Sequence, residues 1–193
     1  MPKLGMQPIR REALVKATIV EISRAGSLDV TVSQIAKRAG MSSALAHHYF
    51  GSKEQMFIAA MRHVLTLYGA EVRGALVVAE GSRGRLRAIV KASFAAVNFR
   101  REVIGAWLNF YVLAQTLPEA KRLLKVYQTR LHSNLMHDLR KLVGPRAEAV
   151  ARGVAALIDG VYIREALKQR APDGAAAAAV VLHYLNLELE GQE

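Results

Sequence analysis

Three aromatic residues in the segment AWLNFY have types and spacing that could bind a ligand. Trp107 and Tyr111 are four residues apart and share one face of an expected helix, with Phe110 next to that face. Asp159 and Tyr162 are three residues apart on a second expected helix. A quaternary ammonium cation cannot donate a hydrogen bond, so aromatic ring faces and a nearby negative charge must stabilise it. These five residues are therefore a candidate cation cage.

The same residues also have a simpler interpretation. Aromatic side chains at helical spacing usually pack in a hydrophobic core. Asp159 could form an ion pair with Arg164 on the same helix. Spacing alone favours packing of these residues in the core, and a cation cage remains the alternative.

The elements that position these residues are expected to be helices throughout. Apolar residues recur at three- and four-residue intervals, and no segment alternates like a strand. The glycine-rich GSRG at 81–84 is expected to break a long helix. Outside the segment 31–53, the expected helices are 8–25, 53–80, 85–98, 102–114, 118–142, 146–168 and 175–189.

The segment 31–53, TVSQIAKRAGMSSALAHHYFGSK, predicts two short helices joined by a tight turn. Thr31 is expected to cap the first helix, and Ser42 or Ser43 the second. Gly40 lies where the turn needs a left-handed backbone, and Ala36 is small where the helices must cross. This is the sequence form of a helix-turn-helix, whose second helix enters the major groove of DNA.

Side-chain chemistry predicts the DNA contacts of this motif. The hydroxyls of Thr31 and Tyr49 and the ammonium of Lys53 suit phosphate groups. Serine hydroxyls and small apolar side chains suit base edges and thymine methyl groups. The candidates for base contacts are Ser33, Ser42, Ser43, Ala44 and Leu45, with His47 and His48 beside them. Adjacent histidines point about 100° apart on a helix, so we expect no shared metal site.

The charge distribution agrees with DNA binding. The formal net charge is +11. Residues 1–53 hold eight Lys or Arg against three Asp or Glu, and the remaining 140 hold 19 against 13. Positive charge is thus denser around the motif, as phosphate binding requires. Lys3, Arg10 and Arg11 could reach phosphates or a minor groove, or could form a solvated basic end.

The last two expected helices, within about 146–189, are more apolar than one amphipathic helix needs. They contain AVARGVAALIDGVYI and AAAAAVVLHYLNL, which are rich in small and aliphatic residues. Alanine could simply favour helix within the core. We prefer a homodimer interface in which this pair packs on its symmetry mate as a four-helix bundle.

Composition excludes several classes of protein. There is no cysteine, so disulfides and thiolate metal sites are excluded. No apolar run approaches the roughly 20 residues of a membrane span, and the segment MPKLGMQPIRRE lacks the apolar core of a signal peptide. We therefore expect a cytoplasmic protein without cofactor or membrane contact. No phosphate-binding glycine loop, acid/base pair or metal-ligand spacing is present, so no catalytic residue is assigned.

The helix-turn-helix and its flanks resemble the TetR family of repressors. The matching residues are Thr31, Ile35-Ala36, Ala39-Gly40, Ser42, His48, Tyr49-Phe50 and Ser52-Lys53-Glu54. The resemblance implies an all-α, TetR-like fold of about nine helices that binds palindromic double-stranded operator DNA as a homodimer. It implies a three-helix DNA-binding head at 1–53 and a ligand-binding and dimerisation body at 54–193. His47 stands where that family usually has a phosphate-binding tyrosine.

Four separated segments further resemble the choline-sensing branch of that family, which controls glycine-betaine synthesis. They are MPKLGMQ-x-IRR, AWLNFY, RLHSNL at 130–135 and AALIDGVYIREAL at 155–167. The resemblance implies choline as the effector and the cage residues Trp107, Phe110, Tyr111, Asp159 and Tyr162 as its site. It implies repression of choline uptake and oxidation genes that choline relieves. Two alternatives remain. One is a repressor of this family that responds to another small hydrophobic or cationic effector, and the other is a protein that coats DNA without sequence specificity.

Overall fold

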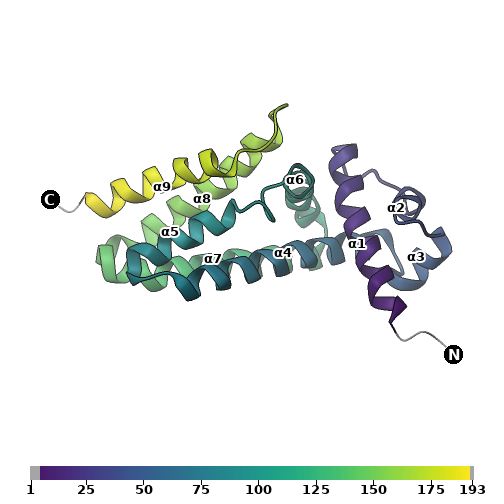
Figure 1. Cartoon of the computed structure of the whole chain (residues 1–193), viewed down its shortest axis with the longest axis horizontal. Coiled ribbons are helices and arrows are strands. Elements are labelled where there is room, and N and C mark those ends of the chain that lie inside the picture. The colour runs from purple at the N-terminus through teal and green to yellow at the C-terminus, as the bar shows by residue number, and fades with distance from the viewer. Residues whose placement is uncertain (1–4, 192–193) are drawn as a thin grey trace.

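The computed structural model describes residues 5–191, which form nine α-helices and one short 3-10 turn. Three helices form a head at one end of an elongated molecule, and six form a helical body (Figure 1). The head helices are α1 (Met6–Ala25), α2 (Val32–Arg38) and α3 (Ser43–Phe50). The body helices are α4 (Lys53–Val78), α5 (Gly81–Ser93), α6 (Arg101–Thr116), α7 (Pro118–Val143), α8 (Ala147–Ala166) and α9 (Gly174–Glu190), with the 3-10 turn at Gly144–Arg146.

Capping residues and one glycine determine where the short helices of the head begin and end. The side chain of Thr31 accepts a hydrogen bond from the backbone N–H of Gln34 and completes a capping box. The side chains of Ser42 and Ser52 cap α3 and α4 by accepting from the backbone N–H groups of Leu45 and Gln55. Gly40 has a φ of 68°, so the left-handed turn predicted between α2 and α3 is confirmed.

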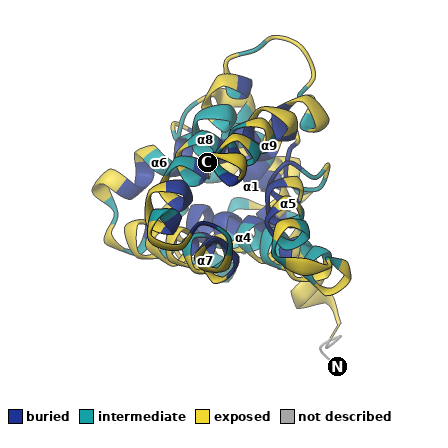
Figure 2. Ribbon diagram, turned by 90° about the vertical axis from the view of Figure 1, so that its left-hand side faces the viewer, coloured by how far each residue is buried: buried dark blue, intermediate teal, exposed yellow. Residues whose placement is uncertain are grey.

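The body packs its helices around a continuous apolar core. Figure 2 shows buried residues on the inward faces of the helices and exposed residues outside. The helices α8 and α9 approach closely at Gly153, where an added Cβ would lie 2.2 Å from the Tyr184 hydroxyl. The carboxylate of Asp138 is fully buried and accepts a hydrogen bond from Arg85 Nε at 3.0 Å, which ties α7 to α5.

The helix boundaries around the GSRG segment differ from the prediction. Ala79 and Glu80 make the turn in extended backbone, and α5 begins at Gly81, whose φ is 61°. The segment therefore starts a helix and does not separate two. This helix ends at Ser93, five residues before the predicted end, because Asn98 donates from Nδ2 to the carbonyl of Ala92 and stabilises a turn there.

Candidate functional site

The recognition helix α3 presents a polar face at the tip of the head. Ser42, Ala44, His47 and His48 are exposed, whereas Ala46 is buried against the head core. The partly covered residues of this helix are Ser43, Leu45, Tyr49 and Phe50. The exposed set coincides with most of the predicted base contacts, and Ser33 is exposed on α2. These residues remain predicted DNA contacts.

Several residues that are predicted to contact DNA also have structural contacts within the head. The Thr31 hydroxyl lies 2.9 Å from Gln34 Oε1 in the capping box. Lys53 Nζ lies 3.4 Å from the carbonyl of Leu28 and 5.8 Å from the centre of the Phe57 ring. His47 Nδ1 lies 3.1 Å from the carbonyl of Gly51 at the end of α3. Thr31 and His47 therefore also stabilise helix ends of the head, and Lys53 ties the start of α4 to the loop between α1 and α2.

Arg11 contacts the end of α3. It donates to the carbonyl of Tyr49 at 2.5 Å, and its guanidinium lies 4.5 Å from the centre of the Phe50 ring. A cation at a helix C-terminus satisfies an open carbonyl and the helix dipole. The structure thus gives Arg11 a role in positioning the recognition helix. Arg10 is exposed, and Lys3 lies outside the described residues.

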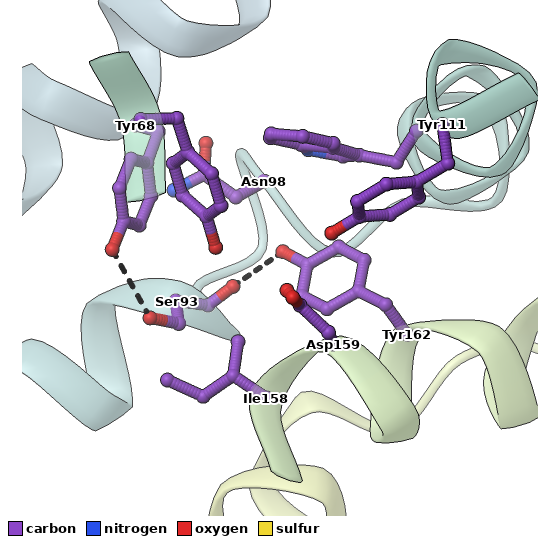
Figure 3. A pocket seen from close by; sticks show the side chains of 9 residues that line it. Tyr68, Ser93, Asn98, Tyr111, Ile158, Asp159 and Tyr162 are labelled. Carbon is purple, nitrogen blue, oxygen red and sulfur yellow. Dashed lines mark hydrogen bonds between the residues drawn. The ribbon is translucent and has the colours of Figure 1, made fainter. Parts of the chain in front are cut away.

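An aromatic cavity lies between the helices of the body (Figure 3). Trp107 is its central ring, with ring centroids 5.8 Å from Tyr111, 4.9 Å from Tyr127 and 6.5 Å from Tyr162. The lining residues are Tyr68, Ser93, Asn98, Trp107, Tyr111, Tyr127, Ile158, Asp159 and Tyr162. The volume of this cavity, about 10 Å³, is just what one ordered water needs.

Asp159 supplies the carboxylate of the cavity. Burial raises its pKa above the usual aspartate value, and a hydrogen bond with Tyr111 opposes that rise. Figure 3 shows the Tyr111 hydroxyl pointing toward this carboxylate. No ion pair of Asp159 occurs among residues 5–191, so the alternative of a pair with Arg164 is not observed. The carboxylate is therefore available to a cation.

Hydrogen bonds fix the tyrosines around this carboxylate. The Tyr162 hydroxyl donates to the carbonyl of Ser93 at 2.5 Å, and the Tyr68 hydroxyl lies 3.4 Å from Ser93 Oγ. Burial raises the pKa values of Tyr68, Tyr111, Tyr127 and Tyr162, with the Asp159 charge adding to the rise. The hydroxyls therefore stay protonated, and Asp159 is the negative group of the cavity.

Four of the five predicted cage residues meet in the cavity, and Phe110 does not line it. Phe110 is 1% exposed and packs edge-on behind Trp107, with ring centroids 5.8 Å apart. This position differs from the prediction because Phe110, three residues from Trp107, falls on the core side of α6. The residues that the sequence interpretation missed are Tyr68, Ser93, Asn98, Tyr127 and Ile158. They lie on other elements, and only the aromatic character of Tyr68 and Tyr127 could have indicated them.

The helix α6 connects the cavity to the head. One of its faces carries Trp107 and Tyr111, while another contacts α1 (Figure 1). At Gly105 the approach is so close that an added Cβ would lie 2.6 Å from Ser23 Oγ. The Ser23 hydroxyl donates to the carbonyl of Arg101 at 3.2 Å. A displacement of Trp107 therefore reaches α1 through one short, rigid helix.

The outer faces of α8 and α9 carry small and apolar residues. Ile163 is 43% exposed on α8, and Val180 and Leu187 are 53% and 56% exposed on α9. They fall in two stripes at helical spacing. The small and apolar members are Ala149, Ala156 and Ile163 along α8, Leu167 at its C-cap, and Ala176, Ala179, Val180 and Leu187 along α9, with Arg152 and His183 exposed among them. The homodimer interface expected on these two helices stays a prediction.

A helix-turn-helix head joined to a helical body with an aromatic cavity is the architecture of a DNA-binding regulator. Residues 14–60 match the model of bacterial regulatory proteins of the tetR family, and residues 82–190 match that of the BetI-type transcriptional repressor C-terminal domain. The chain belongs to the TetR family and has a BetI-type C-terminal domain. Regulators of this family bind operator DNA and dimerise, and they are not enzymes.

Curated relatives match the whole chain. The HTH-type transcriptional regulator BetI of Brucella suis biovar 1 (strain 1330) is 49% identical over 193 residues, covering 100% of this chain and 98% of that protein. BetI of Agrobacterium fabrum (strain C58) is 48% identical over 191 residues, covering 98% and 93%. The all-α fold and the family membership predicted from the sequence are therefore confirmed.

Solved structures share the fold. A transcriptional regulator of Pseudomonas aeruginosa PAO1 superposes with a TM-score of 0.80 at 24% identity, covering 95% of this chain and 92% of that one. A transcriptional regulator of Saccharomonospora viridis in complex with choline gives a TM-score of 0.79 at 21% identity, covering 91% and 95%. None of the helices within residues 5–191 has the length and apolarity that crossing a membrane requires.

Proposed function

We propose that this protein represses genes of choline uptake and glycine-betaine synthesis in the cytoplasm and that choline releases it from its operator. The observation that carries this proposal is the cavity in which Trp107, Tyr111, Tyr127 and Tyr162 surround one unpaired carboxylate, Asp159. The BetI-type domain supports it, as does the choline complex of the S. viridis regulator with the same fold.

The cavity chemistry suits a trimethylammonium group. Aromatic ring faces attract a cation without needing a hydrogen-bond donor, and the attraction grows when the cation is desolvated. Asp159 supplies the opposite charge, which offsets the loss of hydration. The hydroxyl of choline can bond to one of the tyrosine hydroxyls or to Asn98, which also line the cavity.

The size of the cavity supplies the switch. A trimethylammonium group is several times larger than a water molecule, so choline must push the walls of this cavity apart. Outward movement of Trp107 moves α6 and, through the Gly105–Ser23 contact, α1 of the head. The helix α4 also begins in the head and carries the wall residue Tyr68. Choline binds tightly only to the state in which the cavity walls have moved apart, and it therefore favours that state.

The dimer converts this movement into release from DNA. We place the homodimer interface on the outer faces of α8 and α9, because these carry the exposed apolar stripes. Two recognition helices read a palindromic operator only when their spacing matches the half-sites. A tilt of both heads changes that spacing and lowers operator affinity.

The predicted contacts to DNA follow the same model. The α3 face and Ser33 contact base edges, and Thr31, Tyr49 and Lys53 contact phosphates. His47 and His48 lie at the end of α3, within reach of the backbone or a base edge. Specificity depends on this face and on dimer spacing together.

The test is an operator gel shift at fixed salt, with and without choline, using the upstream region of the choline-oxidation genes. The native protein should bind this DNA and release it when choline is added. Asp159→Asn should bind the DNA equally well and lose most of the choline response. The matched control is Glu148→Gln, because Glu148 is an exposed α8 carboxylate outside the cavity. An unchanged operator affinity of the native protein in choline would disprove the proposal.

The same assay separates choline from other effectors. The family allows another hydrophobic or cationic ligand, and aromatic walls would bind either. The small volume of the cavity favours a compact head group over a flat, extended ring. Choline should therefore release the DNA at concentrations at which planar aromatic cations do not. The opposite order would mean that the protein is a repressor of this type whose effector is not choline.

A further inference from the structure

A second recess lies outside the cavity, in a groove between α4 and α7. Its volume is about 620 Å³. The floor and walls are apolar, and Val126 is 41% exposed there. The apolar lining residues are Leu65, Val72, Leu76, Leu123, Val126 and Leu131. Such a surface is costly to leave in water, so it favours a partner with an apolar part.

The charged residues of this groove are all positive. Arg62, Arg73 and Arg130 line it, and no aspartate or glutamate does. Arg62 is paired with Glu119 at 2.8 Å. Neither Arg73 nor Arg130 forms an ion pair with a carboxylate of the described chain. Two guanidinium groups therefore remain for an anion.

The helix register brings these two arginines to one level. The Arg62–Glu119 contact joins positions 57 residues apart, and Arg73 and Arg130 are also 57 residues apart. Because α4 and α7 both run away from this contact, they advance equally, and Arg73 and Arg130 face the same part of the groove. Between Leu65 and Arg73 the groove extends for about 12 Å along α4. This length accommodates a medium-length alkyl chain.

We propose that the α4–α7 groove is a second ligand site, which binds a single-chain amphiphile with an anionic head group. The carboxylate or phosphate lies between Arg73 and Arg130, where guanidinium forks suit its oxygens. The alkyl chain lies on the leucine and valine side chains and points from these arginines toward the DNA-binding head of the protein. Tyr68 and Tyr127 line both this groove and the aromatic cavity, so the ligand touches the cavity wall from outside.

Calorimetry with decanoate tests the site. Decanoate should bind saturably, with one site per protomer. The variant Arg73→Gln/Arg130→Gln should weaken it by about tenfold or more, because two charge-assisted hydrogen bonds are lost. The control Arg122→Gln/Arg140→Gln removes the same charge from exposed positions of α7 outside the groove and should bind as the native protein does.

Three results would overturn the proposal. They are equal decanoate affinity in the two double variants, binding that does not saturate, and binding of phosphatidylglycerol vesicles that depends on Arg73 and Arg130 while decanoate does not bind. Thermal unfolding and operator binding of each variant verify that it is folded. The site does not depend on choline, so the failure of one proposal leaves the other intact.

Discussion

The helix-turn-helix head and the aromatic cavity differ in how far apart in the chain their residues lie. The capping and turn residues of the head fall within 31–53 and act on neighbours three or four positions away. The cavity takes residues from α4, α5, α6, α7 and α8 and from the turn at Asn98. The head is thus a local structure held by caps, whereas the cavity exists only when five helices are packed. This difference predicts that mutations in the two regions have different consequences.

The largest expected effect is that of Trp107→Ala. Trp107 is 6% exposed and contacts three tyrosines of the cavity, so its loss leaves a void. We expect the free energy of unfolding to fall by about 3–5 kcal/mol and choline binding to be lost. Urea denaturation and calorimetry measure these two changes. Operator binding at low temperature should persist, and a variant that still bound choline would show that the ring is only core.

The next effect tests the contact that joins the two regions. In Gly105→Ala the added methyl group would lie 3.1 Å from the Ser23 Cα and still closer to its side chain, so α6 and α1 must separate. We expect a loss of about 1–3 kcal/mol in stability and weaker operator binding without choline. Gly74→Ala on α4 is the control, because its Cβ would meet no atom within 4 Å. Normal operator affinity in Gly105→Ala would exclude α6 as the link.

A smaller effect is expected in the head alone. Thr31→Ala removes the cap of α2 and the capping box with Gln34, at a cost of about 1 kcal/mol. Hydrogen exchange of the α2 amides should become faster, and operator affinity should fall. Choline affinity should stay unchanged, because the cap touches nothing in the cavity. A change in choline affinity would mean that the two regions are not separable in this way.

The smallest effect is the pH dependence of choline binding. Burial raises the pKa of Asp159, so the protonated form is favoured in the free protein. The stability that this carboxyl group contributes is therefore present at low pH and is lost as the pH rises through the raised pKa. Choline favours the ionised form. Its affinity should therefore fall, by at most about tenfold per pH unit, as the pH drops through that raised pKa. In Asp159→Asn the pH dependence of calorimetric affinity should disappear, and a persisting slope would assign it to another group.

The sequence alone predicted the head more completely than the cavity. Thr31, Gly40 and Ser42 have the predicted roles because a cap or a left-handed turn depends on a few adjacent residues. The helix pairs Trp107–Tyr111 and Asp159–Tyr162 were also predicted, since each pair lies on one helix face. That these pairs meet each other could not be derived from spacing, because it depends on how α6 and α8 pack.

The positions of three side chains could be known only from the packed structure. Tyr127 is an aromatic on a long helix like any core residue, and only the crossing of α6 and α7 brings its ring 4.9 Å from Trp107. Phe110 has the same local signal as Trp107 and points into the core instead. Arg11 could have met DNA, and the structure instead places its guanidinium at the Tyr49 carbonyl near the end of α3.

The sequence by itself determined the helices, their caps, the helix-turn-helix, the excess of positive charge near it and the candidate cage residues on each helix. These features depend on interactions between residues close in the chain, or on composition. Only the tertiary structure decided which side chains enclose the cavity, how small it is, that α6 touches α1 at Gly105, and that Arg73 and Arg130 face one groove. These features depend on the distances and angles between helices, which are set by the packing of side chains far apart in the sequence.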